Sequence, residues 1–170
     1  MAHLVLTVVG DDRPGLVNAL AEQVAAHGGN WERSELAELA GAFAGIVLVS
    51  VPDDRQAAFT DALQSLDGML RVTAHGGGST AETVAGERAL EVTVLGNDRP
   101  GIVRDVTAAI ARHALSIDTF RSRTLEAPMA GGTLFEAVVV FRVPQDADAG
   151  TVTTALEQLA GEIQVDLTVA

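Results

Sequence analysis

The sequence predicts an α+β protein built from two similar units, each with the element order βαββαβ. The first observation is a repeat, because "VVGDDRPGLV" at residues 8–17 returns as "VLGNDRPGIV" at residues 94–103. The second is that a short β-branched run precedes each copy and apolar residues at helical spacing follow it. The offset of 86 residues indicates a duplicated domain rather than one turn of a solenoid.

Each copy begins with a strand and a helix. The run "HLVLTVV" (His3–Val9) is short, apolar and β-branched, which favours a strand. We expect Pro14 and Pro100 at the first helical position, where a missing N–H costs nothing, and Gly28–Gly29 as the end of the first helix. The apolar face of each helix repeats at spacings of three and four residues: Val17, Leu20, Val24 and His27, then Val103, Val106, Ile110 and His113.

The remaining elements follow in the same order in both copies. The composition of "NWERSELAELA" (Asn30–Ala40) favours a helix, but its counterpart "SIDTFRSRTLE" (Ser116–Glu126) alternates like a strand, so the repeat predicts strands for both. Apolar strands are predicted at Phe43–Val51 and Leu134–Val143, and closing strands at Met69–Ala74 and Ile163–Val169. The second helices are predicted from their apolar positions: Phe59, Leu63 and Leu66, then Val152, Leu156 and Leu159.

With right-handed crossovers, this order gives a four-stranded antiparallel sheet with two helices on one face, a ferredoxin-like architecture, in each copy. The glycine-rich stretch at residues 76–88, which contains few apolar residues, is the predicted linker. The predicted domains are therefore residues 1–75 and 89–170. Many unrelated functions share this architecture, so the function has to be argued from particular residues.

Composition excludes several functions. All cations are arginines, and the net charge is −12. Residues 1–80 hold four arginines and ten acids, and residues 81–170 hold seven and thirteen, so each half carries −6. Neither half offers the basic face that phosphate contacts require, so we expect no direct nucleic-acid binding. The absence of cysteine excludes disulfides and thiol chemistry. Without a long apolar run or a leader-like N-terminus, we expect a cytoplasmic protein with no membrane contact.

The repeated loop between strand and helix is the candidate binding site. A helix N-terminus offers unpaired N–H groups and a partial positive charge, which hold a small carboxylate or phosphate without any catalytic group. We expect Gly10 and Gly96 to form a tight turn, and Gly15 and Gly101 to lie in the first helical turn. Side-chain oxygens that accept from an ammonium group come from Asp11, Asp12, Asn97 and Asp98. The loop therefore suits a zwitterion, although Asp12 and Asp98 as simple helix caps are the alternative interpretation.

The pattern strand–"G(D/N)DRPG(L/I)V"–helix, written twice in βαββαβ units, resembles the ACT domain, a small regulatory module that binds amino acids. Two further stretches, "SELAELAGAFAGIVLVS" (Ser34–Ser50) and "TLEAPMAGGTLFEAVV" (Thr124–Val139), resemble the tandem-ACT family of glycine cleavage system transcriptional repressors. The inserted "APMAGGTLF" segment of the second copy either covers a pocket or faces a partner protein.

The resemblance implies a ligand between two ACT domains, held by the first β–α loop and by the start of the second strand. Copy one has Asn30 at that second position and copy two has Ser116, so we expect unequal affinities. The residues of this expected site are Gly10, Asp11, Asp12, Arg13, Pro14, Gly15, Leu16 and Asn30, with Gly96, Asn97, Asp98, Arg99, Pro100, Gly101, Ile102 and Ser116.

Other residues leave alternatives open. Arg13 and Arg99 either hold a ligand carboxylate as a bidentate fork or pair with acids across a domain interface, and we favour the second. His27 and His113 suit the ends of equivalent helices, where the helix dipole favours a cation. No histidine spacing matches a metal site and no serine lies in a nucleophile elbow, so we expect neither a metal, a cofactor nor a catalytic residue.

The sequence therefore predicts a non-enzymatic regulator. It would bind a small amino acid, for which the resemblance implies glycine, and act through a protein partner such as a DNA-binding regulator. Exposed edge strands favour a homo-oligomer. One alternative is an acylphosphatase-like hydrolase, which needs an arginine and a nearby asparagine that positions water. Arg13 and Asn30 match this pair only loosely. The other is a dimerisation module that binds no ligand.

Overall fold

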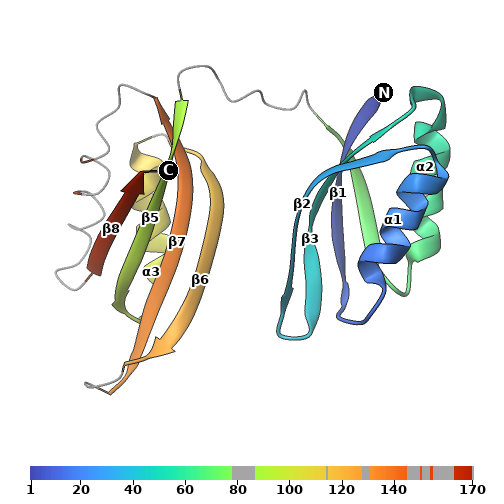
Figure 1. Cartoon of the computed structure of the whole chain (residues 1–170). Coiled ribbons are helices and arrows are strands. Elements are labelled where there is room, and N and C mark those ends of the chain that lie inside the picture. Colours follow the sequence, from blue (N-terminus) through green and yellow to red (C-terminus); the bar gives the residue numbers. More distant parts are fainter. Residues whose placement is uncertain are drawn as a thin grey trace. The chain divides into compact units, whose positions relative to one another are not determined.

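The computed structural model describes residues 1–77, 87–113, 115–127, 131–144, 150, 154 and, as a strand, 163–169. The chain divides into two compact units, Met1–Glu82 (unit 1) and Thr83–Ala170 (unit 2). Each unit has its own sheet (Figure 1). Each also has its own hydrophobic core. We therefore describe each unit by itself.

Unit 1 contains a four-stranded antiparallel sheet with the strand order β2-β3-β1-β4. Helices α1 and α2 cover one face of this sheet (Figure 1), which confirms the predicted architecture. Short 3₁₀ turns precede and follow α2. The elements are β1 (Ala2–Asp11), α1 (Leu16–Ala26), β2 (Asn30–Leu39), β3 (Ala42–Val51), α2 (Gln56–Leu63) and β4 (Arg71–Gly76).

The core of unit 1 lies between the sheet and the two helices. Alternate residues of the strands point into it, because successive side chains of a strand face opposite sides of the sheet. Leu6, Val47 and Phe59 are fully buried there. The opposite face of the sheet carries Val9 and Ile46, which are 45% and 49% exposed. One face of the sheet is thus packed against the helices, and the other carries exposed apolar side chains.

Unit 2 repeats the same sheet with the strand order β6-β7-β5-β8, and α3 packs on one face. The predicted second helix of this copy, with Val152, Leu156 and Leu159, lies outside the described residues. Residues 128–130 of the inserted segment also lie outside the described part of the chain. The described elements are β5 (Glu87–Asn97), α3 (Ile102–Arg112), β6 (Ile117–Glu126), β7 (Thr133–Pro144) and β8 (Ile163–Val169).

The segment whose composition favoured a helix is a strand, as the repeat predicted. β2 pairs with β3 from Asn30, opposite Ser50, to Leu39, opposite Ala42. It is an edge strand with mostly exposed side chains, of which only Trp31 and Leu36 pack against the core. This exposure explains the polar, helix-favouring composition, since an edge strand with one solvated face needs few apolar residues.

The predicted helix starts are wrong by two residues. Pro14 precedes the helix, Gly15 is its N-cap, and α1 begins at Leu16. Gly15 has φ +94°, in the left-handed region, so the backbone is not yet helical there. Gly101 has φ +85°, and α3 begins at Ile102. The glycines therefore precede the first helical turn, whereas the sequence placed them within it.

The predicted end of the first helix is confirmed. α1 ends at Ala26, and Gly28 has φ +69°. The N–H of Gly28 donates to the carbonyl of Ala25, and the N–H of Gly29 donates to that of Val24, both at 2.9 Å. Glycine at this position satisfies the last helical carbonyls without the steric cost of a side chain.

The structure describes both ends of the predicted linker at 76–88. Gly76 is the last residue of β4, and Glu87 and Arg88 begin β5. Residues 78–86 lie outside the described part of the chain. No helix in the described residues is long and apolar enough to cross a membrane.

The left-handed N-cap leads to a stability prediction. Gly15→Ala places a Cβ in a left-handed conformation, although no neighbouring atom obstructs it, and this costs about 1–2 kcal/mol. Gly76→Ala is the matched control, because an added Cβ there also meets nothing and φ is not positive. Urea unfolding should show a lower free energy of unfolding for Gly15→Ala than for Gly76→Ala. Equal values would contradict this account of the helix start.

Candidate ligand-binding site

Each repeated loop follows the central region of its sheet, where β1 or β5 ends. The side chains of residues 11–15 and 97–101 are exposed, whereas Leu16 and Ile102 are buried and anchor the helices that follow. Gly10 and Gly96 lie inside the strands, paired with Phe43 and Phe135, so the predicted turn at these glycines is wrong. A Cβ at Gly10 would lie 2.6 Å from the carbonyl oxygen of Met69. Glycine is required there by a close backbone approach.

The loops leave the N-termini of the helices open. The N–H of Asp12 donates to the carbonyl of Gly41, and the N–H of Asp98 donates to that of Thr133. After these, the N–H groups of Leu16, Val17 and Asn18 find no acceptor among the described residues. In unit 2 Ile102 donates to Arg99, but Val103 and Arg104 likewise have no acceptor in the described part. Each loop thus ends at unbonded amides with partial positive charge.

The alternative that Asp12 and Asp98 are simple helix caps is wrong. The N-caps are Gly15 and Gly101, and no side chain of the described residues makes a capping hydrogen bond at either helix. Both aspartates instead project from an exposed loop whose own amide is bonded to the neighbouring hairpin. Their carboxylates remain accessible to a solute.

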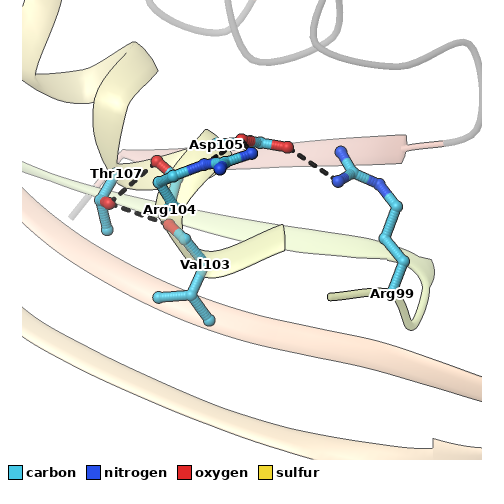
Figure 2. A network of polar contacts seen from close by, with 5 residues as sticks. All are labelled: Arg99, Val103, Arg104, Asp105 and Thr107. Atoms are coloured by element: carbon cyan, nitrogen blue, oxygen red, sulfur yellow. Dashed lines mark hydrogen bonds and ion pairs between the residues drawn. The ribbon is translucent and has the colours of Figure 1, made fainter. Parts of the chain in front are cut away.

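The two loop arginines have different partners. The Nη2 atom of Arg13 donates to the carbonyl of Gly68 at 2.9 Å, which joins the loop to the turn before β4. The Nη1 atom of Arg99 donates to Oδ2 of Asp105 at 2.7 Å, and Arg104 contacts the other carboxylate oxygen (Figure 2). The favoured prediction was pairing across a domain interface. Both contacts lie within one unit, and pairing across a domain interface stays a prediction.

The Arg99–Asp105–Arg104 cluster gives the second loop its own internal carboxylate. Hydrogen bonds from Arg99 and then from Arg104 hold the pKa of Asp105 below its usual value. The position of Asp105 corresponds through the repeat to Ala19 in unit 1, which has no charge. The two loops therefore share a backbone path but differ in their charges.

The start of the second strand lies far from the loop of the same unit. Asn30 is opposite Ser50, which is opposite His3, whereas the loop begins beyond Gly10, seven positions further along β1. At about 3.3 Å per residue this separation is about 23 Å. Ser116 precedes β6, which begins opposite Phe141, and Phe141 is opposite Leu90, again at the far end from Gly96. Neither unit brings its two groups of predicted site residues together.

Sequence reasoning missed a pocket beside the first loop. It is an open depression of about 560 Å³ in unit 1, and we call it the β4 pocket. Only its β1 residues belong to the repeated motif, since the turn before β4 carries no recognisable signature. The β4 pocket is lined by Val9–Asp11, Ala42, the turn Asp67–Met69 and Arg71.

The histidines at the C-terminal ends of α1 and α3 have structural partners. The Nδ1 atom of His27 donates to the carbonyl of Gln23 at 2.8 Å, and its ring lies 5.6 Å from that of Phe59. The N–H of His113 donates to Ile110 at the equivalent helix end. Among the described residues no three potential metal ligands lie close enough to form a site. These contacts explain the histidines through packing and helix termination.

The Asp105 cluster leads to a pH prediction. Since the folded-state pKa of Asp105 is lowered, the cluster stabilises unit 2 above the unfolded-state pKa, and this contribution is lost as the pH falls through the folded-state value. Arg99→Ala should raise the pKa of Asp105, because it removes the strongest hydrogen bond to the carboxylate. A carboxyl-carbon NMR titration measures this. Arg123→Ala, which removes an arginine paired with Glu136, is the control and should leave Asp105 unchanged. An unchanged Asp105 titration in Arg99→Ala would contradict the assignment.

Comparison with known proteins agrees with the fold. Family models described as ACT domains match residues 2–76 and 90–161. The chain is 29% identical to the glycine cleavage system transcriptional repressors of Escherichia coli and Shigella flexneri over 168 residues, which are 95% of this chain and 85% of each relative.

Solved structures match over the whole length. An unknown protein from Galdieria sulphuraria is 32% identical, with a TM-score of 0.85 over 99% of this chain and 98% of that one. A protein assigned as a glycine cleavage system transcriptional repressor has a TM-score of 0.74 at 19% identity, with the same coverage, which supports the fold alone. The chain thus belongs to the ACT-domain family and carries two ACT domains in tandem.

Proposed function

We propose that this chain is a non-enzymatic regulatory protein that binds a small amino acid at a contact between two ACT domains and controls a partner protein. One observation carries the proposal. Both repeated loops present unbonded helix amides beside exposed carboxylate or amide side chains. A zwitterion has the complementary charges, since its carboxylate accepts from the N–H groups and its ammonium donates to the oxygens.

The position of Asn30 and Ser116 favours a site between domains. An amino acid is only a few ångströms long, whereas about 23 Å separates Asn30 from the loop of its own unit. A ligand that contacts both groups of residues must therefore take the loop from one ACT domain and the start of the second strand from another. Such a bridging ligand stabilises the arrangement of domains in which the bridge forms, which is the physical basis of a regulatory response.

The two loops should bind with unequal affinities. In unit 2 Arg99 already donates a hydrogen bond to the carboxylate of Asp105. In unit 1 Arg13 donates only to a neutral carbonyl, that of Gly68. Asn97 replaces the acid that unit 1 has at Asp11. The first loop thus has the stronger charges for an ammonium group, and the second loop carries a competitor for a ligand carboxylate.

The similarity to named repressors suggests the biological setting. Those relatives are glycine cleavage system transcriptional repressors, so glycine is the first ligand to test. With a charge of −6 on each half, we propose that any control of transcription acts through a DNA-binding partner. In the described sheets the edge strands β2, β4, β6 and β8 each have a neighbouring strand on one side only, which supports a homo-oligomer.

The geometry offers less to the other two functions. An acylphosphatase-like mechanism needs an arginine and an asparagine in one site, but Arg13 donates to Gly68 and Asn30 lies at the opposite end of the sheet. A dimerisation module without a ligand does not require open amides in both loops. Turnover of an acyl phosphate would establish the hydrolase, and silence towards every amino acid would favour the dimerisation module.

Calorimetry with a panel of amino acids tests the proposal. We expect small amino acids, glycine first, to bind in the millimolar range or tighter, and glycinamide and acetate to bind much more weakly because each lacks one charge. Asp105→Ala should strengthen binding at the second loop, because it removes the competing carboxylate. No detectable binding of any amino acid would refute the proposal.

A DNA-binding assay tests the charge argument. A gel shift with the purified chain and duplex DNA in physiological salt should show no complex, since neither half neutralises phosphates. Addition of glycine should not create one. Tight binding by the chain alone would contradict the need for a DNA-binding partner.

A further inference from the structure

The β4 pocket contains charges that the fold itself does not pair. Arg71 lines it together with Asp11 and Asp67. Among the described residues the side chains of these three make no hydrogen bond and no ion pair, with one another or with other groups. Opposite charges that share a pocket but stand too far apart to pair leave room for a solute that carries both charges.

Apolar surface lines the same pocket. Val9 and Met69 line the β4 pocket and are 45% and 39% exposed, among the few large apolar side chains of the described residues with such exposure. Val9 is opposite Arg71 in the β1–β4 pair, so apolar and cationic groups are neighbours on the open face of the sheet. An aliphatic side chain placed here would remove this surface from water.

The walls of the β4 pocket are held in place by the fold. The turn before β4 is fixed by N–H groups of Met69 and Leu70, which both donate to the carbonyl of Leu66, and Leu70 is buried. Gly10 allows the carbonyl of Met69 to approach β1, and Arg13 donates to Gly68. A preformed site costs little ordering entropy when a ligand binds.

The second unit does not repeat this chemistry. Leu95 corresponds to Val9 and is paired with Gln164, whereas Val9 is paired with Arg71. Asn97 likewise corresponds to Asp11. The guanidinium and one of the carboxylates are therefore particular to unit 1, although the two sheets have the same topology.

We propose that the β4 pocket is a second amino-acid site, selective for an α-amino acid with an apolar side chain. Arg71 binds the carboxylate, Asp11 and Asp67 bind the ammonium, and Val9 and Met69 contact the side chain. The site is separate from the helix amides of the first loop, and it shares only Asp11 and Gly10 with the residues proposed for the small ligand. It can therefore fail while the loop site stands.

NMR of the methionine methyl groups tests the site with leucine as the probe. The chain has three methionines, and Met69→Leu assigns the signal of Met69. Leucine should shift that signal in a saturable way. Leucinamide, which lacks the carboxylate, and 4-methylpentanoate, which lacks the ammonium, should shift it far less at equal concentration.

Matched variants identify the charges. Arg71→Gln introduces the residue that unit 2 has, and Asp67→Asn removes one carboxylate. Each should weaken leucine binding about tenfold, because a charged hydrogen bond is lost. Arg33→Gln and Asp61→Asn, which change exposed residues of unit 1 outside the pocket, should bind leucine as the unchanged chain does.

The outcomes separate this proposal from the function proposed above. Leucine that leaves the Met69 signal unmoved, or that binds Arg71→Gln and the unchanged chain equally, overturns the β4 pocket as a site. If glycine still binds the loops in that case, the regulatory proposal stands. If glycine does not bind the loops and leucine binds in a way that depends on Arg71, the proposal of a loop site is refuted, whereas the β4 pocket is supported as a binding site.

Discussion

The left-handed backbone at Gly15 and Gly101 is the constraint on which both candidate sites depend. It turns the chain from the inner strand of each sheet into the first helix within a few residues. Because the N-cap is a glycine with no side chain, no side chain in the described part of the protein caps either helix, and the first amides stay open. The same turn places Asp11 and Arg13 next to the turn that precedes β4.

Duplication preserved the backbone and allowed the charges to diverge. Both units have the same strand order and the same glycine N-cap. Their loops nevertheless differ, because Arg99 is neutralised by Asp105, whereas Arg13 is bonded to a carbonyl and fixes the wall of a pocket. The buried positions, by contrast, are constrained by packing in both units.

Sequence alone predicted the fold well, because the repeat supplied an internal comparison. The helical composition of Asn30–Ala40 would have misled a local reading, and its counterpart at Ser116–Glu126 corrected it. The site was less predictable. The preference of proline for the first helical position placed the helix start at Pro14. That preference says nothing about the left-handed residue that follows, and the helix begins at Leu16. The contacts Arg13–Gly68 and Arg99–Asp105, like the β4 pocket, depend on how loops meet in space, which no periodicity encodes.

The central claim is that open amides at the starts of α1 and α3 receive the carboxylate of a small amino acid. A titration of the ¹⁵N-labelled chain with glycine, followed by amide NMR, tests it directly. The account predicts saturable shifts concentrated at Leu16, Val17 and Asn18, with weaker binding at Val103 and Arg104. Amide signals at both helix starts that stay unchanged at saturating glycine, or shifts confined to other parts of the chain, would contradict it.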